Sequence, residues 1–254
     1  MTHDQIQIYE ETFQINMIEC DFNQMLKPGA FFQHLTQAAG IHAARLGVGF
    51  DDFYARDLFW VNSRMKIKFY RYPHAGDTVT IRTWPKTIQQ KLFYIRDFEV
   101  LDAGGQRLAA ASSAWLIINS KTRRLVSPHS LELNLPALSD RIGLDEPLER
   151  LGVAQAGEER LRIRAGYSAV DIVGHVNNSR YVDWICDAFP LEMFSRYRMD
   201  WLQINYDHEI MPGEEVAIRV NTAEQDDHLW ALEGHNQSND TRSFEAMVRW
   251  RDAG

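Results

Sequence analysis

The chain of 254 residues carries the same order of residue types twice, and this internal repeat constrains its fold more than any other feature. Residues 20–32 align with residues 170–182, and residues 67–79 align with residues 204–216 in the same order. Further along, each half ends in a predicted strand that contains a tryptophan, Trp115 or Trp250. Matches in a conserved order indicate two copies of one structural unit.

The first half is predicted to begin with a strand and one long helix. Residues 6–19 alternate apolar and polar side chains, which favours a strand. Residues 28–46 predict a helix, with Pro28 in its first turn and Gly47 at its end. Small and apolar residues cover most of the circumference of this helix, which indicates burial on several sides. Further strands are expected at 61–70, 78–87, 92–101 and 107–119, with a hairpin turn at 102–105.

The second half predicts the same elements in the same order. A strand near 159–167 precedes a helix that begins near Asn178 and that Pro190 ends or kinks. Further strands are expected near 199–208, 214–222, 227–236 and 242–251. The fold class is therefore α+β, with two antiparallel sheets, each wrapped around one helix. We expect an N-terminal domain at 1–125, a charged and proline-rich linker at 126–157, and a C-terminal domain at 158–254.

Composition excludes several classes of partner and location. The net charge of -8 disfavours nucleic acid as a partner, since phosphate binding requires a basic surface. No apolar run approaches the roughly 18 residues that predict a membrane span. The N-terminal residues show no secretory or transit signal, so we expect a cytoplasmic protein. Cys20 and Cys186 are expected to be buried free thiols.

Polar side chains gather where the second helix is expected to begin. Asp171, His175, Asn177 and Asn178 follow a predicted strand directly. A helix N-terminus has unpaired N–H groups and a partial positive charge, which suits a developing oxyanion. The spacing is equally compatible with a structural role, in which an asparagine caps the helix and His175 makes a structural hydrogen bond.

The string D-x-x-x-HVNN-x-x-Y, from Asp171 to Tyr181, resembles the signature of the acyl-acyl-carrier-protein thioesterases, the plant-type fatty acyl thioesterases and their bacterial relatives. The resemblance covers most of the chain and implies two tandem hotdog folds. It also implies hydrolysis of fatty acyl thioesters in fatty acid biosynthesis, with acyl carrier protein as partner and no cofactor.

In that family the working residues lie in the second hotdog. The resemblance assigns catalytic roles to Asp171, His175 and Glu209 in this chain. The family has an asparagine where this chain has Val173, which cannot supply a side-chain hydrogen bond. The cysteine that often follows the glutamate in plant members is Ile210 here, so a cysteine nucleophile at that position is excluded.

The chemistry that this residue set implies is attack by water. Glu209 would be the general base, and Asp171 and His175 would orient the water or the carbonyl group. Backbone N–H groups near Asn177 and Asn178 would stabilise the oxyanion.

The first half lacks this set and is interpreted as the wall of an acyl pocket. Met25 occupies the position of the histidine, and Tyr72 occupies that of the glutamate. Four apolar residues of the first helix are candidates to line the pocket, although most of them are equally suited to core packing: Phe31, Phe32, Leu35 and Ile41.

An acidic carrier protein would require a basic docking area. The N-terminal half offers candidates, each of which could instead be an ordinary solvated charge: Arg64, Lys66, Lys68, Arg71, Lys121, Arg123 and Arg124. A homodimer remains possible.

Three competing functions remain open. They are an acyl-coenzyme A thioesterase of hotdog type, a hotdog hydratase or dehydratase, and a non-catalytic acyl-binding module. The sequence has no Gly-x-Ser-x-Gly elbow, phosphate loop or dinucleotide fingerprint. Its histidines and cysteines lack metal-ligand spacing, so we expect no metal.

Overall fold

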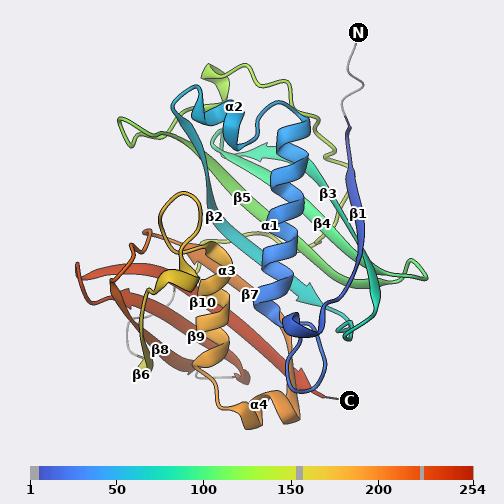
Figure 1. Cartoon of the computed structure of the whole chain (residues 1–254), viewed down its shortest axis with the longest axis vertical. Coiled ribbons are helices and arrows are strands. Elements are labelled where there is room, and N and C mark those ends of the chain that lie inside the picture. Colours follow the sequence, from blue (N-terminus) through green and yellow to red (C-terminus); the bar gives the residue numbers. More distant parts are fainter. Residues whose placement is uncertain (1–5, 153–156, 224–225, 254) are drawn as a thin grey trace. The chain divides into compact units, whose positions relative to one another are not determined.

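The repeated order of elements is present in the computed structural model of the chain, which describes residues 6–152, 157–223 and 226–253 (Figure 1). The chain divides into two compact units. Unit 1 comprises Met1–Cys20, Gln24–Leu26 and His34–Leu148, and unit 2 comprises Asp21–Asn23, Lys27–Gln33 and Glu149–Gly254.

Unit 1 contains one antiparallel sheet with the strand order β1-β3-β4-β5-β2. Its strands are β1 (Tyr9–Gln14), β2 (Leu58–Phe69), β3 (Thr78–Gln89), β4 (Phe93–Asp102) and β5 (Arg107–Asn119). Its helical segments are η1 (Met17–Glu19), α1 (Pro28–Arg45, whose first turns belong to unit 2), α2 (Phe50–Tyr54) and η2 (Pro128–Ser130). The predicted turn at 102–105 is confirmed, since the N–H of Gly105 donates to the carbonyl of Asp102 at 2.9 Å.

Helix α1 lies across the strands of unit 1 (Figure 1). Leu35 and Ala38 on this helix are completely buried, and the sheet contributes buried side chains such as Ile67 and Phe98. Because a buried helix needs side chains small enough for a sheet to approach closely, the alanine-rich sequence of α1 suits this position.

Unit 2 repeats the arrangement with the strand order β7-β10-β9-β8-β6, again antiparallel throughout. Its strands are β6 (Glu158–Arg164), β7 (Tyr197–Tyr206), β8 (Glu215–Ala223), β9 (Asp226–Asn236) and β10 (Thr241–Asp252). Its helices are η3 (Tyr167–Ala169), α3 (Asn178–Asp187) and α4 (Leu191–Arg196). Helix α3 ends before Pro190, as the sequence predicts, and Pro190 occupies the N-cap position of α4, a helix that was not predicted.

Aromatic packing joins α3 to the sheet of unit 2. The ring of Tyr181 meets the ring of Phe244 edge to face at 5.5 Å between centroids. Gly234 makes room for the Phe244 ring, because a Cβ atom at Gly234 would lie 2.0 Å from that ring. These buried contacts hold the start of α3, and therefore the segment just before it, in a defined position.

The first predicted strand is shorter in the structure than in the prediction. β1 ends at Gln14, and Asn16 then accepts from the N–H of Ile18, while Glu19 accepts from the N–H of Asn16. This capping box turns the chain into η1, since a side-chain cap favours a helical turn over continued pairing. Helix α2 was not predicted. The domain boundaries expected from the sequence stay a prediction.

Candidate functional site

The loop that connects η3 to α3 is a tight backbone turn. The N–H of Asp171 donates to the carbonyl of His175 at 3.0 Å, and the N–H of Gly174 donates to the carbonyl of Asp171 at 3.1 Å. Gly174 has φ of +88°, a conformation that favours glycine. The turn places the side chains of Asp171 and His175 near each other at the start of α3.

The imidazole of His175 lies between two carboxylates from different segments. Its Nε2 atom is 3.5 Å from Oε2 of Glu209, and its Nδ1 atom is 4.0 Å from Oδ1 of Asp171. All three side chains are partly accessible, at 33% for His175, 40% for Glu209 and 24% for Asp171. The structure therefore brings together the three residues predicted as catalytic, in a place that solvent reaches.

Backbone hydrogen bonds on both sides of Glu209 fix the position of this residue. The N–H of Val176 donates to the carbonyl of Ile210 at 2.9 Å, which ties the loop after β7 to the segment that holds His175. The N–H of Asp207 donates to the carbonyl of Ser243 at 2.9 Å on the other side of Glu209. Ile210 is completely buried and anchors the loop. The position of Glu209 therefore follows from the sheet of unit 2.

Asn177 has the structural role that the sequence left open. Its Oδ1 atom accepts from the N–H and the hydroxyl of Ser179 at 3.0 and 2.7 Å, so Asn177 caps α3. Its own N–H donates to the carbonyl of Ala169 at 2.9 Å. This N–H is therefore engaged within the fold, and the oxyanion role expected for the N–H groups near Asn177 and Asn178 stays a prediction.

Asn178 is the first residue of α3, and its backbone groups differ in their hydrogen bonding. Its carbonyl accepts from the hydroxyl of Tyr206 at 3.1 Å. Among the described residues, its N–H has no hydrogen-bond partner. A helix N–H without a partner, close to His175, is a suitable donor to an oxyanion.

Val173 lies on the exposed side of the turn. Its N–H donates to Oδ1 of Asp171 at 3.0 Å, and its side chain is 39% accessible. Asn177 Nδ2 donates to the other carboxylate oxygen of Asp171 at 3.4 Å. The Asp171 carboxylate therefore has two donors in the structure without an asparagine side chain at position 173.

The positions of unit 1 that correspond to His175 and Glu209 carry neither an imidazole nor a carboxylate. Met25 pairs with His74 through an isolated backbone bridge, and Tyr72 stacks on Phe69 with ring centroids 5.0 Å apart. Neither Met25 nor Tyr72 supplies a carboxylate or an imidazole, so the chemistry predicted for the second half has no equivalent here.

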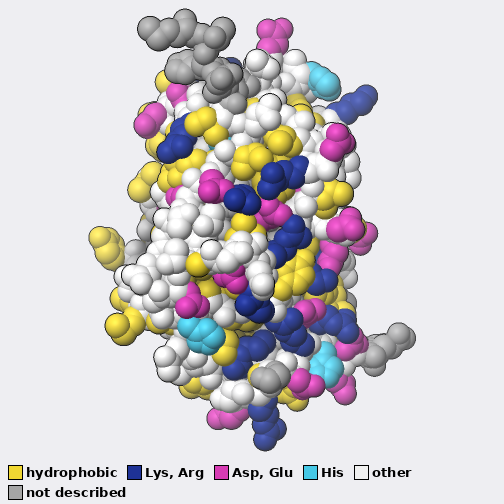
Figure 2. Space-filling view, turned by 90° about the vertical axis from the view of Figure 1, so that its right-hand side faces the viewer, with side chains coloured by type: hydrophobic (Ala, Val, Ile, Leu, Met, Phe, Trp, Pro, Cys, Tyr) yellow, Lys and Arg dark blue, Asp and Glu magenta, His cyan; other side chains and the backbone are white. Residues whose placement is uncertain are grey.

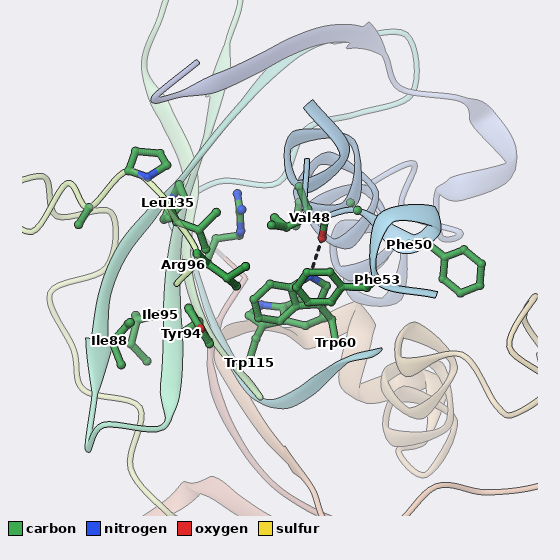
Figure 3. A pocket seen from close by; sticks show the side chains of 18 of the residues that line it. Val48, Phe50, Phe53, Trp60, Ile88, Tyr94, Ile95, Arg96, Trp115 and Leu135 are labelled. Carbon is green, nitrogen blue, oxygen red and sulfur yellow. Dashed lines mark hydrogen bonds between the residues drawn. The ribbon is translucent and has the colours of Figure 1, made fainter. Parts of the chain in front are cut away.

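Unit 1 instead contains an apolar cavity of about 510 Å³ (Figure 3). One wall is α1, which presents small residues such as Ala39, Gly40 and Ala43. The other walls come from α2, from strands β2 to β5 and from the segment 133–137, with aromatic side chains that include Phe53, Trp60, Tyr94 and Trp115. A volume of this size suits a chain-like apolar ligand.

The residues predicted to line an acyl pocket do not line this cavity. Phe31, Phe32 and Leu35 are at most 1% exposed and belong to the core, which was the alternative considered for them. Ile41 also lies outside the lining. The lining residues of α1 are the small ones, because a cavity forms where side chains are short. The small residues at 38–40 and 43–44 were the sequence signal that was missed.

The cations predicted to dock a carrier protein are mostly engaged with acids or carbonyl groups. Lys66 and Lys68 both pair with Glu146, and Arg64 donates to the carbonyl of Leu148 at 3.1 Å. Two further pairs are Arg71 with Asp102 and Lys121 with Asp57, both at 2.6 Å. In one face of the molecule, Lys and Arg side chains lie interspersed with Asp and Glu side chains (Figure 2). These pairs neutralise much of the expected basic area.

Two kinds of feature are absent from the described residues. No group of three or more His, Cys, Asp or Glu side chains within that part of the chain is arranged to hold a metal ion. No helix there has the length and apolarity needed to cross a membrane.

Comparison with known proteins identifies relatives over nearly all of the chain. Residues 6–129 match the family model of the acyl-ACP thioesterase N-terminal domain, and residues 153–252 match that of the acyl-ACP thioesterase C-terminal domain. The chain is 29% identical over 233 residues to a chloroplastic acyl-[acyl-carrier-protein] hydrolase of Cuphea viscosissima. That match covers 85% of this chain and 55% of the relative, so the chain spans about half the length of this curated relative.

Solved structures show the same fold. An acyl-ACP thioesterase from Bacteroides thetaiotaomicron superposes with a TM-score of 0.87 at 27% identity, covering 96% of this chain and 98% of the other. The 12:0-ACP thioesterase from Umbellularia californica has a TM-score of 0.80 at 23% identity, covering 97% and 98%, and supports the fold alone. The predicted α+β class with tandem hotdog folds is confirmed.

Proposed function

This chain belongs to the acyl-ACP thioesterase family, and from that premise we propose that it hydrolyses the thioester of fatty acyl-acyl carrier protein and releases free fatty acid. The observation that carries the proposal is the convergence of Asp171, His175 and Glu209 within unit 2. Two carboxylates around a partly accessible imidazole form an acid–base set that can activate water. The names of the relatives support the carrier-linked substrate.

In the proposed first step, Glu209 removes a proton from a water molecule as its oxygen attacks the thioester carbonyl carbon. His175, 3.5 Å from Glu209, holds that water or the carbonyl oxygen in orientation. Asp171 orients the imidazole from the Nδ1 side. The N–H of Asn178, which has no partner in the described part of the chain, donates to the oxyanion at the N-terminus of α3, where the helix dipole favours negative charge.

In the second step the tetrahedral intermediate collapses and the carbon–sulfur bond breaks. The electron pair of that bond leaves on sulfur, and the proton taken by Glu209 passes to the thiolate. The products are a carboxylic acid and the free thiol of the carrier, and Glu209 returns to its carboxylate form. Atoms and charge balance over these two steps without a metal or an organic cofactor.

The apolar cavity of unit 1 is proposed to hold the acyl chain. Its lining is dominated by apolar and aromatic side chains, which match the surface of a hydrocarbon chain. We expect its dimensions to limit the chain length that the protein accepts.

The test is hydrolysis of a series of saturated acyl chains of increasing length, each linked to acyl carrier protein and to coenzyme A. Released thiol is measured for the wild-type protein and for a double variant, Asp171→Asn with Glu209→Gln. The proposal expects wild-type turnover on the carrier-linked series and its loss in the double variant. Higher turnover on the coenzyme A series would favour an acyl-coenzyme A thioesterase. Binding without hydrolysis on either series would identify a non-catalytic acyl-binding module.

A further inference from the structure

A charged side chain interrupts the apolar wall of the cavity in unit 1. Arg96 extends from β4 toward α1 and lines the cavity (Figure 3). Its Nη1 atom donates to Nδ1 of His42 at 3.0 Å and to the hydroxyl of Thr83 at 3.2 Å. Nε2 of His42 donates to the carbonyl of Ile6 at 2.7 Å, which leaves Nδ1 as the acceptor. The described contacts of Arg96 are therefore both with neutral groups.

No carboxylate in the described part of the chain forms an ion pair with Arg96. The adjacent Asp97 points to the opposite face of the strand, as alternation requires, and bonds Lys86, Ser112 and the N–H of Gly143. Burial lowers the pKa of Arg96 to about 10, so the guanidinium is still protonated at neutral pH. A largely enclosed cation without an acidic partner is costly unless a ligand supplies an acceptor.

A second polar group lies on the same face of β4. Tyr94 precedes Arg96 by two residues and lines the same cavity, with its ring edge to face on Trp60 at 5.0 Å. Its hydroxyl is buried and has no hydrogen-bond partner among the described residues. Nε and Nη2 of Arg96 likewise make no hydrogen bond within that part of the chain. The cavity wall thus offers several unused donors in an otherwise apolar surface.

We propose that the cavity receives an acyl chain that carries oxygen along its hydrocarbon part, as a hydroxyl or keto group that accepts a hydrogen bond from Arg96, with Tyr94 as a further donor. This inference rests on the proposed function, because it places the acyl group of the substrate in this cavity. A plain methylene chain would cover these donors without satisfying them. An oxygen at the same depth would satisfy them in a site from which the ligand displaces water.

The size of the expected preference follows from the strength of such a bond. A hydrogen bond to a charged group in a desolvated site corresponds to a preference of about tenfold to hundredfold. The oxygenated chain should therefore exceed the plain chain of equal length in kcat/KM by about that factor, at the hydroxyl position that reaches Arg96.

The catalytic test compares dodecanoyl-acyl carrier protein with hydroxydodecanoyl-acyl carrier proteins in which the hydroxyl moves along the chain. Three variants are measured beside the wild type. Arg96→Met keeps the length of the side chain without its donors, and Tyr94→Phe removes a hydroxyl that has no described partner to lose. Arg82→Met, in the accessible ion pair with Glu10 on the same sheet, is the matched control. The preference should fall at least tenfold in Arg96→Met, fall less in Tyr94→Phe, and remain in Arg82→Met.

A binding test separates this inference from the proposed function. Pantetheine amides of dodecanoic and hydroxydodecanoic acids replace the thioester by a bond that the protein does not cleave, and calorimetry measures their affinity. Tighter binding of one hydroxylated amide by the wild type, lost in Arg96→Met, supports the inference even if no thioester is hydrolysed. Equal or tighter binding of the plain amide at every hydroxyl position would overturn it, as would an unchanged preference in Tyr94→Phe and Arg96→Met together.

Discussion

Nε2 of His175 lies 3.5 Å from Oε2 of Glu209, although the two residues come from separate loops of unit 2. One backbone hydrogen bond, from the N–H of Val176 to the carbonyl of Ile210, joins the residues that follow each of them. The spacing of the pair is therefore set by the backbone of the fold, and the side chains can be exchanged without moving the loops.

Replacement of the Glu209 carboxylate tests its role as a base. Glu209→Gln keeps the shape of the side chain and removes its ability to accept a proton, so we expect kcat to fall by about a hundredfold or more. Thiol release from acyl-acyl carrier protein measures the effect, and the melting temperature should stay close to that of the wild type. Glu192→Gln on α4, an exposed carboxylate elsewhere in unit 2, is the control and should retain full activity. Wild-type turnover in Glu209→Gln would eliminate this base.

The Val173→Asn substitution introduces the asparagine that the family has at this position and tests the effect of its side-chain hydrogen bond. The side chain of Val173 is 39% accessible and only its backbone N–H bonds Asp171, so Val173→Asn should fold like the wild type. A new side-chain hydrogen bond to water or substrate should raise kcat/KM by up to about tenfold. Steady-state kinetics and a thermal melt measure the two expectations. A marked loss of activity in a folded variant would mean that the chain has adapted its site to the valine.

Enlargement of Gly40 tests whether the cavity holds the acyl chain. A Cβ atom at Gly40 meets no atom within 4 Å, and the residue lines the cavity. We expect Gly40→Leu to shift hydrolysis toward shorter acyl chains, because the new side chain fills part of the cavity. Gly40→Ala should preserve the length profile and stabilise α1 by about 0.5–1 kcal/mol.

Gly29 on the same helix provides the contrasting control. A Cβ atom there would lie 1.9 Å from Oδ1 of Asp183, so Gly29→Ala should lower the free energy of unfolding. If Gly40→Leu folds and keeps the wild-type length profile, the acyl chain lies elsewhere.

The buried imidazole of His42 predicts a dependence of stability on pH. Burial lowers the pKa of His42 from 6.5 to about 4 in the folded protein. The unfolded chain therefore binds the proton more readily, and the free energy of unfolding should fall as the pH decreases from about 6.5 to about 4. Urea unfolding at a series of pH values measures this slope, which should be smaller in His42→Gln. Equal slopes in the two proteins would contradict the assignment.

Local patterns in the sequence predicted most of the fold. The range 28–46 predicted α1 (Pro28–Arg45) almost residue by residue. The proline marks the start of the helix and the glycine its end, and the continuous apolar surface indicates its burial. The capping box at Asn16 and Glu19 was overlooked, so the first strand was extended by five residues beyond Gln14. Helix α2 has only five residues, too few for a periodic pattern to emerge.

The sequence motif identified residues that the fold brings together, but not their spatial relations. The proximity of Glu209 to His175 depends on backbone pairing between distant segments, which local patterns do not encode. The engagement of the Asn177 N–H by Ala169 is likewise a tertiary contact. Phe31 and Leu35, which were candidates for the pocket wall with core packing as the alternative, belong to the core, since large apolar residues fill space while small ones leave it. The catalytic roles themselves stay predictions.

The two loops that precede α1 and α3 share one backbone plan. A short 3-10 turn leads in each case into an isolated bridge, Cys20 with Leu26 in one copy and Val170 with Val176 in the other. The internal repeat of the sequence is therefore also a repeat of local backbone geometry. One copy carries His175 and the other has Met25 at the same place, so one backbone plan holds different side-chain chemistry in the two units.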